Sequence, residues 1–310
     1  MTDPAVSFYQ TLVAAATEAS SVLLGTVKML DCVYVDYRPE VAPDFGQTLN
    51  IAIPGVATSG ITDIGTGDFS LSTPAATTVP LVFNNHPAGA FPITDFSQYN
   101  TPSDVRRIFL DAYFKALVEY VDSDLCSLIS TGNFTTTPIT GGTPGEIVGA
   151  DMQNAWGQLA TNRVNVSDLG NMFLVNHPKV YGAMLEDNYW TANSQIGYQL
   201  AGDIRRHAML GQQWGVLIDY DQNTPTFSSG SPATTKYKNL IFHRNAIALA
   251  VRPLPNPVTN VVESTTIFFG PLPVRIMLGY NQLKAGWVTT LDCGYARGVI
   301  RPEMGVVVTV

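Results

Sequence analysis

The sequence predicts an α+β fold, and three patterns along its 310 residues support that prediction. Residues 101–131 have the apolar spacing of one long helix. Residues 47–53, and several stretches after residue 260, alternate apolar and polar side chains, which is typical of half-buried strands. Between these parts, residues 143–185 alternate short helical and strand-like patterns, which indicates a mixed lobe.

The long helix is the most regular element that the sequence predicts. Its roughly 30 residues would span about 45 Å. Thr101, Pro102 and Asp104 match a capped helix start, and Gly132 suits a left-handed residue at the C-terminal end. The apolar stripe on this helix consists of Val105, Ile108, Phe109, Ala112, Ala116, Leu117, Tyr120, Val121, Leu125, Leu128 and Ile129.

Five residues of this stripe are the expected core of the helix, and its charged residues, Asp122 among them, fall outside the stripe. A charge placed on the buried side would lack a partner, so substitution there should be poorly tolerated. The expected core residues are Ile108, Phe109, Leu117, Val121 and Leu125.

Residues 46–95 predict an extended, two-armed β hairpin. The segment is rich in Gly, Pro, Thr and Ser, and only three charged residues, all aspartates, lie between Gly46 and Asn100. A solvated loop of this length would normally carry more charge, so we expect it to lie on another surface. The apolar side chains expected to contact other subunits are Phe69, Leu71, Leu81 and Phe83.

The remaining elements are short. The predicted elements are an N-terminal helical segment at 5–30, a capped helix opening at Thr143–Glu146, a buried strand at Met172–Val175, a helix from Pro178, a hairpin-like pair at Tyr237–Phe242 and Ala246–Val251, and closing strands at Val261–Phe269, Val274–Tyr280, Ala285–Leu291 and Val306–Val310. The N-terminal segment is either an arm that lies on a neighbouring subunit or a helix docked on its own subunit.

Composition favours a subunit that associates with copies of itself. Charged residues make up 14% of the chain, against about 25% in an ordinary soluble domain. No apolar run approaches the ~18 residues that a membrane helix needs. A monomer covered by Thr, Ser, Asn and Gln is the alternative. The net charge of −8 argues against nucleic-acid binding through phosphate neutralisation, although an acidic protein can still enclose nucleic acid.

The cysteines and the N-terminus indicate a reducing compartment. Cys32, Cys126 and Cys293 are odd in number and far apart, and no Cys-x-x-Cys pair occurs. This pattern favours free thiols over a disulfide framework. The first residues lack the basic and apolar regions of a signal peptide, so none is expected.

No catalytic, cofactor-binding or metal-binding motif is present, so the sequence predicts a protein that is not an enzyme. There is no phosphate-binding loop and no Gly-x-Ser-x-Gly elbow, and the four histidines are scattered. Asp122 and Asp124 diverge on a helix. Asp219 and Asp221 would lie on one face of a strand. They are either the solvated end of that strand or a carboxylate pair. Carboxylates and histidines distant in sequence can still meet in space, so an assembled site stays open.

The order of these parts resembles the major capsid proteins of tailed bacteriophages, which have the Hong Kong 97-type fold. In both, an N-terminal arm, a two-armed β loop and a long helix precede a mixed lobe and closing strands. Three segments are similar to coat proteins of the Salmonella podovirus type, although residues 190–235 leave no space for the large inserted domain that some of them carry. The segments are Gly46–Ile51, Thr77–Phe83 followed by Phe91–Thr94, and Phe242–Leu254.

The resemblance implies a structural protein whose copies form hexamers and pentamers of an icosahedral shell around double-stranded DNA. Scaffolding, portal and decoration proteins are the further partners, no cofactor, sequence-specific DNA contact or membrane is involved, and the location is the virion, assembled in the host bacterial cytoplasm. The implied domains are an N-terminal arm with a first peripheral segment (1–45), the extended loop (46–95), the peripheral domain with the long spine helix (96–139), the axial domain (140–255) and closing strands that are mainly peripheral (256–310).

Two other functions remain open. An encapsulin-like shell protein of a cellular compartment would share the fold and hold enzyme cargo in place of DNA. A β-rich hydrolase would use distant Asp and His residues and form a small oligomer.

The lysines predict a shell without covalent cross-links. In some relatives a lysine of the extended loop bonds to an asparagine of a neighbouring subunit. This chain has no lysine between Gly46 and Asn100. Its six lysines are Lys28, Lys115, Lys179, Lys236, Lys238 and Lys284.

Overall fold

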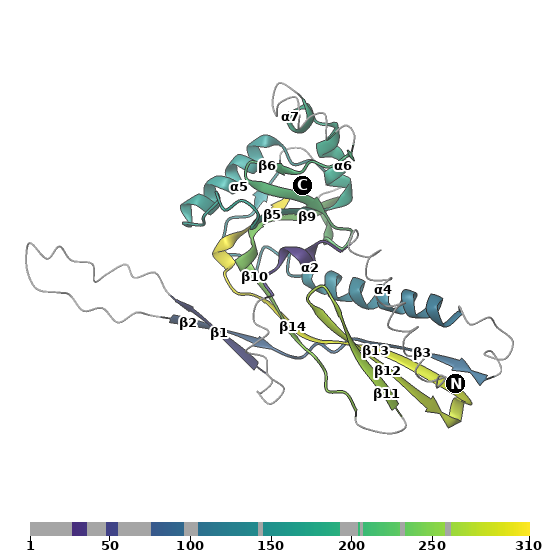
Figure 1. The fold of residues 1–310 in the computed structure, drawn as a ribbon. Coiled ribbons are helices and arrows are strands. Elements are labelled where there is room, and N and C mark those ends of the chain that lie inside the picture. Colours follow the sequence, from purple (N-terminus) through teal and green to yellow (C-terminus); the bar gives the residue numbers. More distant parts are fainter. Residues whose placement is uncertain are drawn as a thin grey trace, which may run out of the picture.

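The α+β class is confirmed by the computed structural model, which contains both helices and sheets (Figure 1). The structure describes residues 27–35, 48–54, 76–95, 105–141, 145–192, 204, 207–229, 233–257 and 262–310. The predicted N-terminal helical segment before residue 27 and the helix cap at Thr101–Asp104 lie outside these residues. So do Phe69 and Leu71, and the side chain of Ile108 is also not described.

Helices and strands follow one another along the described chain. The helices are α2 (Met29–Cys32), α4 (Val105–Cys126), α5 (Gly149–Thr161), α6 (Pro178–Glu186) and α7 (Asn188–Thr191), with short 3₁₀ turns η3 (Arg244–Ala246), η4 (Gln282–Lys284) and η5 (Pro302–Met304). The strands are β1 (Thr48–Pro54), β2 (Ala76–Val82), β3 (Ala88–Thr94), β4 (Ile139–Thr140), β5 (Met172–Asn176), β6 (Gln212–Gln213), β7 (Val216–Tyr220), β8 (Thr226–Ser229), β9 (Thr234–His243), β10 (Ile247–Arg252), β11 (Val262–Phe269), β12 (Leu272–Asn281), β13 (Gly286–Asp292), β14 (Gly294–Val299) and β15 (Gly305–Thr309).

One half of the molecule is a four-stranded antiparallel sheet with α4 along one face (Figure 1). The strand order is β11-β12-β13-β3. Phe114 of α4 is fully buried and meets Phe269 of β11 edge-on, with ring centroids 5.5 Å apart. Burying an aromatic side chain of this size is among the larger single contributions to a core. The helix and the sheet therefore share one apolar core.

The other half is a seven-stranded mixed sheet covered by α5 and α6. Its main order is β4-β15-β9-β5-β7-β6, and β8 pairs with the outer part of β9. Met172 to Asn176 are all buried, because β5 lies in the middle of this sheet. Trp190 is fully buried, and its Nε1 donates to the Ile147 carbonyl oxygen at 3.1 Å, which satisfies its polar atom inside a second core.

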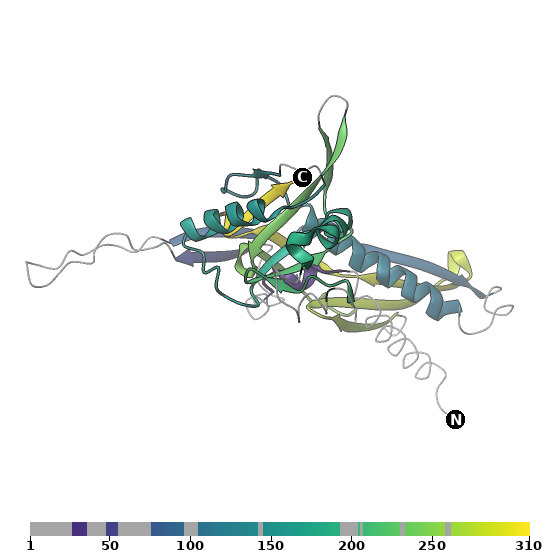
Figure 2. The ribbon, with the colours of Figure 1, turned by 90° about the horizontal axis from the view of Figure 1, so that it is seen from above.

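Two short strand pairs join these halves at one end. β10 pairs with β14, and β1 pairs with β2 from Thr48↔Val82 to Pro54↔Ala76. The two pairs pack on each other and form a third, small core. Figure 1 and Figure 2 both show β1 and β2 on the side of the molecule that lies away from α4.

Several sequence predictions are confirmed. The buried strand at 172–175, the helix from Pro178 and the closing strands all appear within a few residues of their expected bounds. The helix start at Pro178 uses His177 as its cap, whose Nδ1 accepts from the Lys179 amide at 3.2 Å. β14 was missed, because its sequence GYARGV has two glycines and a charge and lacks the alternation of an ordinary strand.

The hairpin predicted at 237–251 is wrong. β9 and β10 follow each other through η3 but enter different sheets: β9 pairs with β5 and β15, and β10 pairs with β14. Both strands are buried on both faces along much of their length, so each finds partners on separate layers. Continuous apolar strands cannot be paired from their sequence alone.

Two predicted helix ends are also wrong. α4 ends at Cys126, where the amides of Leu128 and Ile129 donate to the carbonyls three residues back, and Gly132 is not left-handed. The helix expected to open at Thr143–Glu146 begins at Gly149. At this start the Asp151 carboxylate accepts a hydrogen bond from the Val148 amide at 3.2 Å, which caps the helix later than predicted.

The buried face of α4 is rotated from the predicted stripe. Leu117, Val121 and Leu125 are buried, but Phe109 is 46% exposed and Tyr120 is 58% exposed. The prediction that Phe109 belongs to the core is therefore wrong for the single chain. The physical reason is that α4 is apolar on two sides, and only one side packs on the sheet. That side also carries the buried residues Leu110, Phe114 and Val118.

Candidate functional site

The hairpin strands β1 and β2 pack on their own subunit. Leu81 is only 2% exposed and lies on β14, where a Cβ on Gly298 would come within 2.6 Å of its Cδ2. Phe83 is half-buried, with the Arg252 guanidinium 5.8 Å from its ring centroid. The expectation that Leu81 contacts another subunit is therefore wrong, and Phe83 is mostly covered within the same chain. The register places both side chains on the face that meets β10 and β14.

β3 belongs to a sheet and not to the hairpin. Residues 88–94 pair with β13 from Gly286↔Thr94 to Asp292↔Ala88. Among the described residues, only β1 and β2 form the arms of the hairpin. The extended segment predicted at 46–95 therefore ends at Val82.

α4 exposes a second apolar stripe. Phe109, Ala112, Ala116 and Tyr120 are all exposed and follow one another at helical spacing. Phe109 reaches the sheet only at its edge, with its ring centroid 6.0 Å from that of Phe91. An exposed stripe of this kind on a long helix is typical of a contact surface.

Asp124 connects α4 to the strand pair β10–β14. Its carboxylate receives two hydrogen bonds from the Arg297 guanidinium, the one from Nη2 measuring 2.5 Å, and a third at 2.8 Å from the Tyr295 hydroxyl. Burial, followed by the bond to Asp124, raises the pKa of Tyr295 above its ordinary value. A paired Arg–carboxylate contact of this geometry also sets orientation, because two parallel bonds define a plane.

A second ion pair lies across the four-stranded sheet. The Arg275 guanidinium donates to both oxygens of Asp292, at 2.9 and 2.5 Å, and His86 Nε2 lies 3.0 Å from Asp292. Asp292 is buried, where an unpaired charge would be costly, and these two partners compensate its negative charge. The first ion pair connects α4 to β14, whereas the second joins the adjacent strands β12 and β13 of one sheet.

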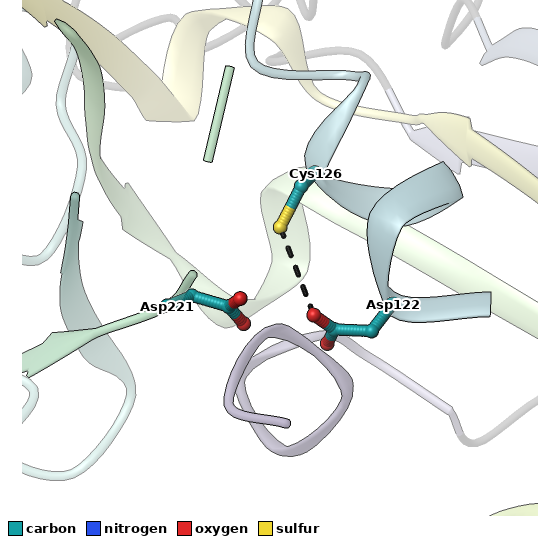
Figure 3. A group of neighbouring side chains, drawn as sticks. All are labelled: Asp122, Cys126 and Asp221. Carbon is teal, nitrogen blue, oxygen red and sulfur yellow. Dashed lines mark hydrogen bonds between the residues drawn. The ribbon is translucent and has the colours of Figure 1, made fainter. Parts of the chain in front are cut away.

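The third polar cluster is buried where α2, α4 and the end of β7 meet. Asp122 and Cys126 lie on α4 and Asp221 directly follows β7, and one ligand atom from each lies within 4.8 Å of the others. All three side chains are buried, and Figure 3 shows the two carboxyl groups facing each other beside α2. Among the described residues, these are the ones that could hold a metal ion.

The electrostatics of this cluster follow from its burial. Loss of solvation, followed by the charge and the hydrogen bond of Asp221, raises the pKa of Asp122 to about 8, although Asn223 and the Leu30 amide oppose this rise. Burial also raises the pKa of the Cys126 thiol. A thiol of this kind is a poor nucleophile, because the thiolate is the reactive form. Cys32, Cys126 and Cys293 are all buried and unpaired.

Sequence reasoning did not find this cluster. It placed Asp122 outside the buried stripe and left Asp221 as either a solvated strand end or half of a pair with Asp219; the structure makes Asp221 fully buried and pairs Asp219 with Lys28 at 3.4 Å. One signal was available. Asp122 lies four residues after Val118 and three before Leu125, which is the spacing of the face that the structure buries.

Within the described residues no helix is long and apolar enough to cross a membrane. The other expected contacts, at Phe69 and Leu71, stay predictions.

Comparison with known proteins gives matches only among solved structures. No protein-family model and no curated protein matched the sequence. A structure from Mycobacterium phage Che8 is 16% identical, with a TM-score of 0.63 and 90% of each chain covered. The capsid of the cyanophage P-SCSP1u is 13% identical, with a TM-score of 0.61, covering 85% of this chain and 83% of that one.

A third match comes from an archaeal source. The virus-like particle from Pyrococcus furiosus is 13% identical, with a TM-score of 0.51, covering 96% of this chain and 98% of that one. At such identities the matches define the fold. The chain has the fold of phage capsid subunits, over almost its whole length.

Proposed function

We propose that this chain is the major capsid protein of a tailed phage with double-stranded DNA. Copies would assemble as hexamers and pentamers into an icosahedral head, with scaffolding, portal and decoration proteins as partners and the host cytoplasm as the place of assembly. The observation that carries this proposal is the fold, which matches phage capsid chains over about nine-tenths of both chains in the first match.

Three features of the chain support the same function. Its low content of charged residues suits a subunit that buries much of its surface against copies of itself. The hairpin arms β1 and β2 carry no charged residue, and α4 exposes an apolar stripe. The net charge of −8 suits an inner surface along which packaged DNA can move without being held.

The domain plan of the Hong Kong 97-type fold fits the arrangement of the cores. In this proposal the four-stranded sheet and α4 form the peripheral domain, with α4 as the spine helix. The seven-stranded sheet, α5 and α6 form the axial domain near the centre of each capsomer. The hairpin that begins with β1 is the extended loop, and its tip lies over the neighbouring subunit.

An encapsulin-like compartment shell is the second candidate, and the match to the Pyrococcus furiosus virus-like particle favours keeping it. Both candidates are closed shells, so they differ in what the shell contains. Purified particles that contain long DNA support the phage head, whereas particles that contain one enzyme support the compartment.

The test of the proposal is expression of the full chain, alone and together with a scaffolding protein, followed by negative-stain electron microscopy. The expected result is closed icosahedral particles of uniform size. A small soluble oligomer under both conditions would contradict the proposal and favour a different class, such as a hydrolase.

The shell should be held without covalent bonds. No lysine lies between residues 46 and 100 to attack a neighbour, and the three buried thiols are not placed for inter-subunit disulfides. Mature particles boiled in detergent with reductant should give a single band near 33.5 kDa on a denaturing gel. Ladders, or protein that stays in the well, would show a cross-link.

A further inference from the structure

Two histidines cap the starts of helical segments in the same way. His177 precedes α6, and its Nδ1 accepts from the Lys179 amide at 3.2 Å. His243 precedes η3, and its Nδ1 accepts from the Asn245 amide, also at 3.2 Å. A ring nitrogen that accepts a hydrogen bond carries no hydrogen, so each cap needs an imidazole whose Nδ1 is unprotonated. In the neutral ring the hydrogen is then on Nε2.

The two rings differ in what surrounds Nε2. His243 Nε2 lies 3.2 Å from the Asp168 carboxylate, which also accepts from Asn171 Nδ2 at 3.0 Å. A positive His243 ring would therefore have a negative partner. Within the described part of the chain, His177 Nε2 takes part in no hydrogen bond, and no carboxylate lies close enough to act on its ring. A positive His177 ring would have no such partner.

The groups that face His177 come from three elements. α6 contributes Lys179, whose positive charge opposes a second positive charge on the ring. β9 contributes Tyr237, whose ring centroid lies 4.4 Å from that of His177, and Asn239, whose Oδ1 accepts from the His177 amide at 3.0 Å. Both are uncharged near neutral pH. β5, which ends at Asn176, has no titratable side chain. A proton on His177 therefore costs a cap and gains no ion pair.

The first turn of α6 holds a segment that is distant in the sequence. Tyr181 lies one turn after the cap, and its amide donates to the His177 carbonyl oxygen at 3.0 Å. The Tyr181 hydroxyl accepts from the Leu210 amide at 2.8 Å and donates to the Ala208 carbonyl oxygen at 3.3 Å. Leu210 is fully buried, so these bonds fasten residues 208–210 to α6.

We propose that His177 is an acid-sensitive cap: a proton on its Nδ1 breaks the bond from the Lys179 amide and loosens the first turn of α6 together with residues 208–210. The step transfers one proton from the solvent to a neutral imidazole, which becomes an imidazolium with two N–H groups. Nδ1–H then faces the Lys179 N–H, so two donors meet and the cap is lost. His243 loses the same bond but gains an ion pair with Asp168, so η3 stays closed. This proposal concerns the single chain and does not depend on its assembly into a shell.

The direction of the pH effect follows from the surroundings of the ring. Burial, followed by the charge of Lys179, lowers the pKa of His177 from its ordinary value of 6.5, and the ring recovers that value when the turn opens. The contribution of the cap is therefore complete above about pH 6.5, decreases as the pH falls below that value, and is gone below the lowered pKa. Hydrogen bonds from Asn171 and His243 lower the pKa of Asp168, so that carboxylate remains charged in this range.

Hydrogen exchange followed by mass spectrometry tests this on full-length, non-assembled subunits. After correction for intrinsic rates, the opening constant of residues 179–184 should rise about fivefold from pH 7.5 to pH 5, the effect of losing one helix cap. Residues 208–210 should follow, whereas η3 should show no such rise. His177→Asn keeps a capping oxygen that does not titrate, so its opening constant should not change with pH. His86→Gln removes a histidine that pairs with Asp292 in the other sheet, and this variant should respond to acid as the unchanged chain does.

Nuclear magnetic resonance of the imidazole nitrogens supplies a second readout. In the unchanged chain at pH 7.5, the His177 ring should carry its hydrogen on Nε2, and it should gain a second hydrogen only below pH 6.5. The His177 signal is the one missing from the spectrum of His177→Asn, or from that of His177→Ser, which also caps. A hydrogen on Nδ1 at pH 7.5 or titration above pH 6.5 would overturn the proposal. So would equal exchange of α6 at both pH values, an equal acid response at η3, or an acid response that persists in His177→Asn.

Discussion

Replacement of residues 58–72 by Asn-Gly is expected to abolish closed particles while the subunit remains folded. The described arms of the hairpin are anchored on their own chain, because Leu81 and its neighbours pack on β10 and β14. The replaced residues contain Phe69 and Leu71, the apolar side chains expected to lie on a neighbouring subunit. The replacement stops short of Ala76, where β2 begins, so the anchored strands are kept. Asn-Gly suits a tight connection between antiparallel strands.

The measurement combines two assays on the same preparation. Circular dichroism and thermal melting should match those of the unchanged chain, and electron microscopy with size-exclusion chromatography should show free subunits or small oligomers. Particles that close at normal yield would show that the hairpin tip is not an assembly element. An unfolded subunit would show instead that the tip is needed for folding.

Phe114→Ala is expected to destabilise the subunit by about 3–5 kcal/mol, the range for removing a fully buried aromatic ring. Phe114 is 0% exposed and packs on Phe269, so its loss leaves a cavity between α4 and the sheet. Phe109→Ala, on the same helix, is the matched control. Phe109 is already about half exposed in the single chain, so its loss should cost about 1 kcal/mol or less.

Urea unfolding of non-assembled subunits measures both values. The contrast also separates folding from association. If the exposed stripe of α4 is an assembly contact, Phe109→Ala should reduce particle yield although the subunit stays stable. Equal destabilisation by both substitutions would contradict the assignment of the buried face.

The sequence alone determined the class of fold and its main elements. α4, β1, β5, α6 and the closing strands follow from local periodicity and caps, which do not depend on the rest of the chain. The absence of catalytic motifs and the scarcity of charge were likewise readable from the residues. Together with the resemblance to phage capsid proteins, these features led to the fold that the solved capsids share.

Tertiary structure decided which faces are buried and which strands pair. α4 is apolar on two sides, so periodicity could not choose between Phe109 and Phe114, and the position of the sheet made the choice. β9 and β10 are adjacent in sequence, but they separate because each is buried on both faces along much of its length and has partners in a different layer. Leu81 was expected to contact another subunit, but in the folded chain it is buried against β14 of its own subunit.

The carboxyl pair is the clearest case of a feature that only the folded chain contains. Asp122 and Asp221 are 99 residues apart, and no spacing rule connects them. Their proximity depends on α2 being packed between α4 and the end of β7, which brings the amides of Lys28 and Met29 to Asp221. Local patterns reflect interactions over a few residues, whereas the burial of a charge depends on everything that surrounds it.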